Sequence, residues 1–304
     1  MPATCEVSVV IAAFNREALI ERALRSVWSQ TLAPAEVIVV DDCSSDDTAT
    51  VARAAGAQVL RHGQNRGPAA ARNTAIEAAT QPWIAVLDSD DEWLPHHLAT
   101  LWPLRDGHDL VAGSAIYSSS PEFPSRLAGW PRRRALLLRS PAQLLYPENP
   151  IPSTVLLNRE AVRRAGGYDE QVWFVEDIDL YARVLERGSG LVAPIVTCVY
   201  RHHSGQATAD LAYMHAQRRM LVERFAKRRW AKPGVLSRMQ AVTEWDSLRL
   251  AIRQRSRSDC LRAGAWLAGH PAASLALVGL WSWRFQARRG GREQAALLRT
   301  GDRV

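Results

Sequence analysis

Two groups of carboxylates follow apolar runs in the first third of the chain. Carboxylate oxygens are the ligands that hard divalent cations prefer in proteins. Two acidic groups on one edge of a sheet would repel each other unless a cation or hydrogen-bond donors lay between them. The alternative is structural, because Asp and Ser also end strands and cap helices, as Ser45 or Asp46 would here. The acids are Asp41, Asp42, Asp46 and Asp47 in "VVDDCSSDD", and Asp88, Asp90, Asp91 and Glu92 in "VLDSDDEW".

Short β-branched runs alternate with helical patterns around these acids. Apolar residues recur at helical spacing over 19–28, and Pro68 suits the first turn of a helix in "GPAAARNTAIEAA". A short surface helix without a functional role is predicted to begin at His96 and His97. Strands alternating with helices predict an α/β fold with right-handed crossovers, whose ligands bind at the carboxyl ends of the strands. The predicted strands are 6–13, 36–42, 57–62 and 82–90.

Other motifs for metals and phosphates do not fit the chain. An EF-hand loop that began at Asp42 would need Gly and Glu at the positions of Asp47 and Arg53. The first strand is followed by "AAFNRE" and no GxxxxGK[ST] occurs, so neither a dinucleotide fingerprint nor a P-loop is supported. The four cysteines form no CxxC pair, and neither a disulfide framework nor a structural zinc site is predicted.

Charge is divided unevenly along the chain, which marks a predicted domain boundary. Residues 1–212 carry a net charge of −6 and residues 213–304 one of +13, which together give the +7 of the whole chain. We therefore expect an acidic α/β domain over 1–212 and a basic helical extension over 213–304. The two parts should have different roles.

The extension permits two interpretations. Trp266, Trp281 and Trp283 flank an apolar stretch that Pro271 interrupts, so a full membrane span is not expected. The helices could pack on the sheet as a subdomain. Alternatively, they could lie on anionic lipid with the tryptophans at headgroup depth. The charge balance favours the membrane surface.

The ordered blocks of the chain resemble glycosyltransferase family 2, the inverting GT-A type, over roughly residues 6–210. The resemblance implies a Rossmann-like, mostly parallel sheet flanked by helices, with the catalytic domain over 1–212. It also implies a nucleotide-diphospho-sugar donor, first of all a UDP-sugar, with Mn²⁺ or Mg²⁺. The sugar would pass with inversion to a hydroxyl of a glycan or lipid-linked acceptor in cell-surface polysaccharide synthesis. The blocks are "VSVVIAAFNRE", "VIVVDDCSSDDT", "NRGPAAARNTAI", "WIAVLDSDDEWLP", "AGGYDE" and "VEDIDLYAR".

By position, the resemblance implies a role for four acids. Asp42 would bind the base of the donor, Asp88 the ribose region, and Asp90 the metal that bridges the two phosphates. Asp177 would be the base that deprotonates the acceptor hydroxyl. The chemistry agrees, because a divalent ion stabilises the charge on a departing diphosphate and inversion requires a base on the opposite face of the sugar. Asp177 also begins a predicted helix, whose N-terminal dipole favours an ionised carboxylate.

Neighbouring residues offer alternatives in the "VEDIDL" block. Glu176 and Asp179 stand close enough to Asp177 to be the base instead, and all three could simply cap the first helical turn. Upstream, Gly167 in "RRAGGYDE" suits a helix C-cap. The resemblance implies that this loop lies under the acceptor site. Both interpretations of Gly167 can hold.

Further donor-site residues are predicted around the acids. Arg66 and Arg72 flank a turn that faces the acids of the second strand, where nucleotide contacts and structural salt bridges both fit. Arg201 and His203 in "YRHHSG" match a mobile loop of the family, with Arg suited to diphosphate and His to the metal. His202 is the alternative ligand. By position, the resemblance also assigns Ala13, Asn15 and Ser89 to donor binding.

Two other classes of protein stay open. A nucleotide-sugar binding module would not need Asp177, and a nucleotidyltransferase would carry a Gly-rich basic loop where "AFNRE" stands. No RRM, KH or helix-turn-helix pattern occurs, so a nucleic-acid partner is not expected. The N-terminus shows no signal-peptide pattern, and the cysteines fit a reducing compartment. We therefore expect a cytoplasmic protein, peripheral on the inner face of the membrane if the extension binds lipid.

Overall fold

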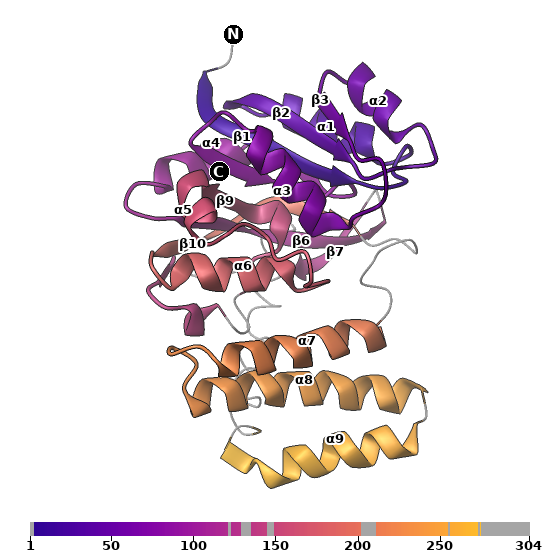
Figure 1. Ribbon diagram of the computed structural model, residues 1–304, viewed down its shortest axis with the longest axis vertical. Helices are drawn as coiled ribbons and strands as arrows, with labels where there is room; N and C mark the ends of the chain where they lie inside the picture. Colours follow the sequence, from indigo (N-terminus) through magenta and orange to yellow (C-terminus); the bar gives the residue numbers. More distant parts are fainter. Residues whose placement is uncertain are drawn as a thin grey trace.

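The structure is a computed structural model, whose described residues form a ten-stranded sheet with helices on both faces and a stack of helices beyond one of these faces (Figure 1). The order of the strands is β3-β2-β1-β4-β9-β6-β10-β5, with β7 beside β6 and β8 beside β10. The described residues are 3–120, 123–128, 135–144, 149–201, 211–254, 256–272 and 274.

The first part of the chain confirms the alternating pattern. β1 pairs in parallel with β2 on one side and with β4 on the other, and β2 pairs in parallel with β3. Pro68 stands in the first turn of its helix, and Asp46 accepts a hydrogen bond from the N–H of Thr48 (3.1 Å) at the start of another. The elements are β1 (Thr4–Ala13), α1 (Ile20–Trp28), β2 (Ala33–Asp41), α2 (Thr48–Ala54), β3 (Gln58–Arg61), α3 (Pro68–Ala78) and β4 (Trp83–Val86).

The second part extends the sheet with strands of both directions. β9 lies antiparallel between β4 and β6, and β6 pairs in parallel with β10. The remaining strands pair antiparallel at the far side. The strands are β5 (Glu92–Trp93), β6 (Leu110–Ser120), β7 (Phe123–Ala128), β8 (Leu136–Leu138), β9 (Val155–Asn158) and β10 (Gly190–Arg201). The helices are α4 (His97–Leu101), η1 (Trp102–Leu104), η2 (Pro141–Gln143), η3 (Pro152–Thr154), α5 (Arg159–Arg164) and α6 (Glu176–Leu185).

Two apolar cores lie on opposite faces of the sheet. Side chains alternate along β1, so that Val9 and Ile11 enter the core with α1, α2 and α4, while Val10 enters the core with α3, α5 and α6. The central strands are apolar on both sides, as helix-covered parallel strands are. Packing on both faces fixes the parallel strands β1, β2 and β4, so that their carboxyl ends lie at one edge of the sheet. The acids of the two clusters follow these ends.

The helix predicted at His96 and His97 is confirmed, with His96 as its N-cap, but the expectation that it lies on the surface is wrong for His97. The side chain of His97 is fully buried and stacks on Trp93 with the ring centroids 4.1 Å apart. Leu98 and Leu101 of the same helix are buried in the core with α1. Burial lowers the pKa of His97 to about 3, so the ring stays neutral.

The extension folds as a stack of helices next to α6 (Figure 1). Leu221 and Phe225 pack with Val172 and Val175, which lie just before α6. Within the described part of the chain, no helix combines the length and hydropathy that crossing a bilayer requires. Trp281 and Trp283 lie outside the described residues. The helices are α7 (Leu211–Ala226), α8 (Pro233–Gln254) and α9 (Arg257–Gly269).

Candidate active site

The carboxyl ends of β1, β2 and β4 lie side by side. Ala13, the last residue of β1, is in register with Asp41 of β2, and its carbonyl accepts the N–H of Asp42 (2.8 Å). Asp88 follows β4, which runs parallel to β1 on its other side. The two acidic groups therefore share one edge of the sheet, as the strand pattern predicted. Buried Ser89 stands at the same edge.

Three non-glycine residues in the described part of the chain have positive φ, and all three lie at ends of elements around this edge. Asn15 (φ 52°) follows β1, Cys43 (φ 67°) follows β2, and Phe174 (φ 66°) precedes α6. The side-chain oxygen of Asn15 accepts the N–H of Ser45 (2.9 Å), which ties the first loop to the second. Such conformations cost energy and concentrate at functional sites.

Asp42 holds the loop before α3. Its carboxylate accepts the N–H of Gly67 (2.7 Å) and of Arg66 (3.0 Å), and lies 2.6 Å from Nδ1 of His62. The other nitrogen of His62 lies 2.9 Å from the hydroxyl of Thr74 on α3. Asp42 therefore fixes the backbone of the loop beside which the base of the donor is expected. Its contact with that base stays a prediction.

Arg72 joins the two halves of the site. Its buried guanidinium lies 2.7 Å from a carboxylate oxygen of Asp88 and 2.7 Å from one of Glu176. It also stands over the ring of Tyr168, 5.4 Å from the centroid. The structure contains the salt bridges that were one interpretation of Arg72, and a contact of Arg72 with the nucleotide stays a prediction. This pair of contacts links the end of β4 to the start of α6.

Asp91 connects the acidic cluster to η3 and to β10. Its buried carboxylate accepts the hydroxyl of Ser153 (2.5 Å) and the N–H of Arg201 (3.1 Å). The same hydroxyl accepts the N–H of Asp88 (3.0 Å). Burial, reinforced by the charges of Asp88 and Asp90, raises the pKa of Asp91 well above its usual range.

Two acids of the cluster, Asp88 and Asp90, repel each other, and Arg16 lies 3.8 Å from a carboxylate oxygen of Asp90. Burial raises the pKa of Asp88 although Arg72 opposes the shift, and the charge of Asp90 raises it further. A divalent ion would relieve this repulsion. The side chains of Asp88 and Asp90 are 24% and 17% exposed. Among the described residues, no three His, Cys, Asp or Glu side chains are placed so that they could hold one metal ion together. The donor set therefore fits an ion such as Mg²⁺ or Mn²⁺ that takes one or two carboxylates and completes its shell with phosphate and water.

The start of α6 separates the three candidate bases. Glu176 pairs with Arg72, and Asp179 pairs with Arg183 (2.7 Å). Among the described residues, Asp177 has no partner in an ion pair. Burial, followed by the charge of Glu176, raises the pKa of Asp177 to about 7. Desolvation thus outweighs the helix dipole that was expected to favour the ionised form.

Gly166 and Gly167 follow Ala165, the C-cap of α5, and both have positive φ, so the glycines lie at a helix end as predicted but one and two positions beyond the cap. The N–H of Gly167 donates to the carbonyl of Val162 (3.0 Å). A Cβ on Gly167 would lie 2.8 Å from the side-chain oxygen of Asn73, so a larger residue does not fit. The carbonyl of Gly167 accepts a bond from Arg183 (2.7 Å), the partner of Asp179. The loop before α6 is therefore braced from two helices.

Two further arginines lie at the rim of the site. Arg201 ends β10, and its Nε donates to Glu92 (3.0 Å) beside the acidic cluster. Arg66 pairs with Glu170 (3.2 Å) in the loop before α6. His202 and His203 lie outside the described residues.

Sequence reasoning missed Ser153 and Tyr168. Ser153 orients Asp88 and Asp91, and Tyr168 lies under the guanidinium of Arg72. Ser153 stands in "IPSTV", an ordinary strand-entry sequence that gives no chemical signal. Only the fold brings it next to residues more than 60 positions away.

The fold and the site together define a GT-A glycosyltransferase. A family model described as "Glycosyl transferase family 2" matches residues 8–165. The succinoglycan biosynthesis protein ExoU of Rhizobium meliloti is 31% identical over 91% of this chain and 87% of its own length. The chain belongs to glycosyltransferase family 2.

Two solved structures share the fold. One is Staphylococcus aureus TarS 1-349 in complex with UDP-GlcNAc, with a TM-score of 0.65 and 18% identity over 86% of this chain and 81% of that one. The other is the mannosyltransferase PcManGT from Pyrobaculum calidifontis in complex with GDP-Man and Mn²⁺. It has a TM-score of 0.58 and 20% identity over 98% of this chain and 88% of that one. These similarities confirm the GT-A fold.

Proposed function

We propose that the protein transfers a sugar, with inversion, from a nucleotide-diphospho-sugar to a hydroxyl of a glycan or lipid-linked acceptor, using Mg²⁺ or Mn²⁺. The observation that carries this proposal is the state of Asp177. It is a buried carboxyl with a pKa of about 7 that makes no ion pair among the described residues. Its neighbour in the chain, Glu176, is linked through Arg72 to Asp88. A buried carboxyl with a raised pKa costs folding stability when it ionises. A protein that only binds the donor would gain nothing from this cost, whereas an enzyme would gain a base.

The acids at the strand ends would bind the donor. In this proposal Asp42 and Asp88 contact the nucleoside, and Asp90 holds the metal. When bound, the metal supplies positive charge to the diphosphate as it departs. Arg72 holds the carboxylate of Asp88 in place, and the hydroxyl of Ser153 accepts the backbone N–H of Asp88. The remaining predicted donor contacts lie near the ends of elements around this edge, except Arg72, which lies within α3. They are Ala13, Asn15, Ser89, Arg66, Arg72 and Arg201.

Asp177 would act on the acceptor. The acceptor oxygen attacks the anomeric carbon from the face opposite the diphosphate, and its proton passes to the Asp177 carboxylate. The bond from the anomeric carbon to the diphosphate oxygen breaks, and its electron pair leaves with the nucleotide. One displacement of this kind inverts the anomeric centre. A base with a pKa near neutrality combines an adequate ionised fraction with basicity.

Relatives suggest the classes of substrate. The solved structures contain UDP-GlcNAc in one protein and GDP-Man in the other, so the fold accepts both bases. ExoU is named for succinoglycan biosynthesis. We therefore propose a polysaccharide-building role, with UDP-sugars tested first and GDP- and dTDP-sugars next.

A nucleotide-sugar screen tests the function. A true donor stabilises the protein by RT ln(1 + [L]/Kd), which is about 2.7 kcal/mol at a concentration of 100 Kd. We expect a rise in Tm and slow hydrolysis with one donor when Mg²⁺ or Mn²⁺ is present, and loss of both with EDTA. If no UDP-, GDP- or dTDP-sugar changes Tm or is hydrolysed, the assignment to sugar transfer is wrong.

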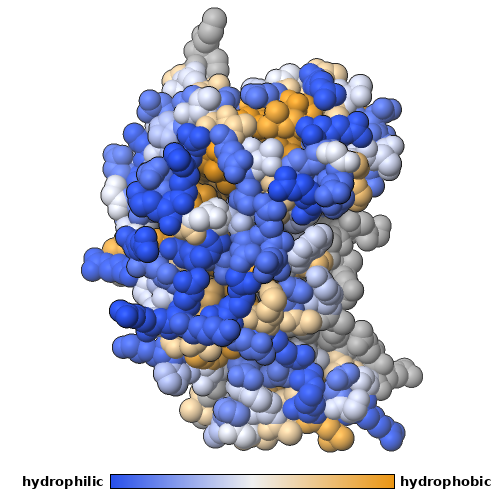
Figure 2. All heavy atoms as spheres, viewed as in Figure 1, coloured by the Kyte–Doolittle hydropathy of each residue, from blue (hydrophilic) through white to orange (hydrophobic). Residues whose placement is uncertain are grey.

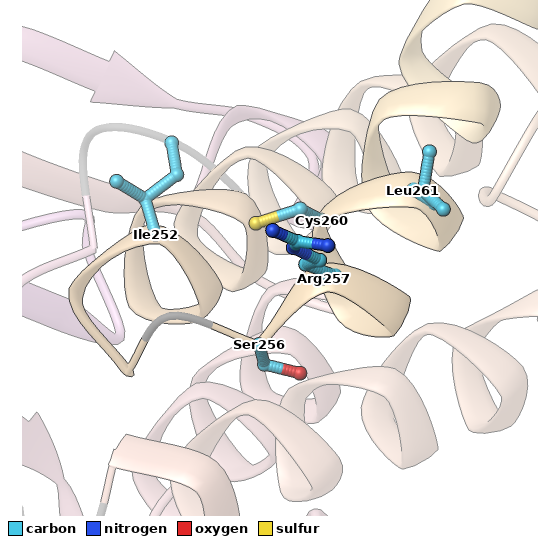
Figure 3. Close-up of a pocket in the computed structure, with 5 residues that line it drawn as sticks. All are labelled: Ile252, Ser256, Arg257, Cys260 and Leu261. Atoms are coloured by element: carbon cyan, nitrogen blue, oxygen red, sulfur yellow. The ribbon is translucent and has the colours of Figure 1, made fainter.

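The extension offers a surface for an anionic bilayer. Hydrophilic residues cover most of the face shown in Figure 2. At the connection between α8 and α9, the described large apolar side chains left exposed are Ile252 (60%) and Leu261 (74%). They flank a hollow that Arg257 and Cys260 also line (Figure 3). Trp266 packs instead against α8, although it was expected at headgroup depth. Contact here would place the enzyme on the inner face of the membrane.

Cosedimentation with vesicles tests this surface. We expect the full-length protein to sediment with phosphatidylglycerol vesicles at low salt, and less at high salt, because residues 213–304 carry a net charge of +13. Replacing Ile252 and Leu261 together by Ser should weaken binding by about tenfold or more, because each aliphatic side chain contributes about 1.5–3 kcal/mol when fully buried. Ile195→Ser, 42% exposed on β10, is the matched control. Absence of cosedimentation would leave the extension with a packing role only.

A further inference from the structure

An exposed aromatic side chain lies in the loop that leads to the proposed base. Trp173 is 40% exposed although it belongs to a segment whose neighbours Val172 and Val175 are buried. The next residue, Phe174, has a φ of 66°, which a bulky residue rarely adopts. Asp177 follows Trp173 by four residues, a span of at most about 14 Å. An exposed ring and a strained backbone thus lie together in the segment that leads to the proposed base.

The indole ring of Trp173 lies against Gly67, and the next residue, Phe174, lies against α7. A Cβ on Gly67 would lie 2.8 Å from Cζ2 of Trp173, so the ring lies against the backbone at the start of α3. The N–H of Gly67 donates to Asp42, which places the ring beside the loop that this acid fixes. Next along the chain, Phe174 packs edge-on against Tyr213 of α7, with the centroids 5.0 Å apart.

The same two loops are joined by polar contacts. Arg66 pairs with Glu170 (3.2 Å), and Asn73 donates to the carbonyl of Tyr168 (2.9 Å). The loop from Gly167 to Trp173 is therefore attached to α3 at several points. Because the loop that carries Trp173 is already ordered, binding a ligand to the ring would cost little conformational entropy.

We propose that Trp173 is a stacking platform for the sugar ring of the acceptor that carries the attacking hydroxyl. The inference rests on the proposed function. A pyranose presents a face of C–H groups, which matches the electron-rich face of an indole, and its hydroxyls stay available to polar partners. The platform stands on the segment that carries the base, whereas the proposed donor residues come mainly from the strand ends. Stacking would therefore orient the acceptor hydroxyl toward Asp177.

Saturation-transfer NMR with simple glycosides tests the platform without turnover. The probes are methyl β-D-glucoside, methyl β-D-galactoside and methyl N-acetyl-β-D-glucosaminide, added to the full-length protein with UDP and Mg²⁺. We expect transfer to the ring C–H protons of at least one probe in the wild type and in Trp173→Phe. In Trp173→Ala the affinity for that probe should fall by about tenfold, which corresponds to about 1.4 kcal/mol. The matched control is Trp28→Ala, 48% exposed at the end of α1, which should behave like the wild type.

UDP affinity, measured by calorimetry, separates this role from others. Equal Kd values for UDP in the wild type and Trp173→Ala, together with the loss of glycoside binding, would support the platform. Unchanged glycoside binding in Trp173→Ala would overturn it, as would silence of all three probes with the wild type. A loss of UDP affinity with intact glycoside binding would assign the ring to the nucleotide and also overturn it. Donor hydrolysis by the wild type tests the proposed function separately, whatever the glycosides show.

Discussion

Asp90→Asn should abolish metal-dependent sugar transfer while the protein stays folded. The amide keeps the shape of the carboxylate but loses the negative charge that would hold the cation against the diphosphate. We expect kcat/KM to fall by about 10²–10³, the usual cost of removing one preorganised charge from a transition state. Titration of activity with Mn²⁺, together with calorimetric binding of Mn²⁺ in the presence of UDP, measures the effect.

Stability should respond much less to the same change. The charge of Asp90 raises the pKa of both Asp88 and Asp91, so its removal relieves repulsion within the cluster. The variant also loses the ion pair of Asp90 with Arg16 (3.8 Å), so its Tm without metal should stay close to that of the wild type. Asp106→Asn is the control, because its side chain is 83% exposed beside Arg105 and should leave both activity and Tm unchanged. Near-wild-type turnover in Asp90→Asn would refute the assignment of the metal to this residue.

The strand ends explain why so much of this site could be read from the sequence. A parallel sheet brings the carboxyl ends of its strands to one edge, so residues that follow strands in the chain become neighbours. Asp42 and Asp88 are 46 positions apart in the sequence, yet they flank the same end of β1. Periodicity in the sequence predicted both strands, and their parallel pairing predicted that the residues after them would be neighbours.

Contacts made by side chains across elements could not be read in this way. The turn after Arg66 faces Asp42 as expected, but which carboxylates the side chain of Arg72 reaches, those of Asp88 and Glu176, was not predicted. Helical position alone does not determine which of several nearby carboxylates a long side chain reaches. The buried position of His97 was missed for a related reason, because a polar residue at a helix start looks exposed until its neighbours are known.

The pKa of Asp177 is a second property that the sequence alone could not predict. Its place in the first turn of α6 favours the ionised form, and sequence reasoning could use only that fact. Burial acts in the opposite direction and is the larger effect, which brings the pKa to about 7. Desolvation depends on packing around α6, including Val175 and Tyr168, and no local pattern reveals it.

The pH dependence of stability follows from this raised pKa. Between the unfolded pKa near 4 and the folded value of about 7, the native state holds a proton that the unfolded chain has lost. Asp177 therefore costs stability progressively as the pH rises through this window. Asp177→Asn cannot ionise, so its Tm should exceed that of the wild type at pH 8 by more than it does at pH 5. Thermal unfolding at the two pH values measures the difference.

Activity should show the opposite trend. The base works when ionised, so wild-type kcat should rise with pH through about 7 and then level off, with donor and metal kept saturating. Asp177→Asn should lose about 10²–10⁴ in kcat with little change in the donor Kd, because only the proton acceptor is removed. The remaining rate should lack the rise near neutrality. Donor Kd from calorimetry and a pH–rate profile for each protein test these expectations.

The neighbouring acids supply the decisive controls for Asp177. Glu176→Gln removes a charge that raises the pKa of Asp177, so this variant should keep the rise in kcat but show it at lower pH. Asp179→Asn breaks the pair with Arg183 and should lower Tm while the midpoint of the pH profile stays close to that of the wild type. If Asp177→Asn keeps most of its turnover while one of these two variants loses it, that neighbour is the base. Normal turnover in all three would place the base outside α6 and overturn the mechanism proposed for this site.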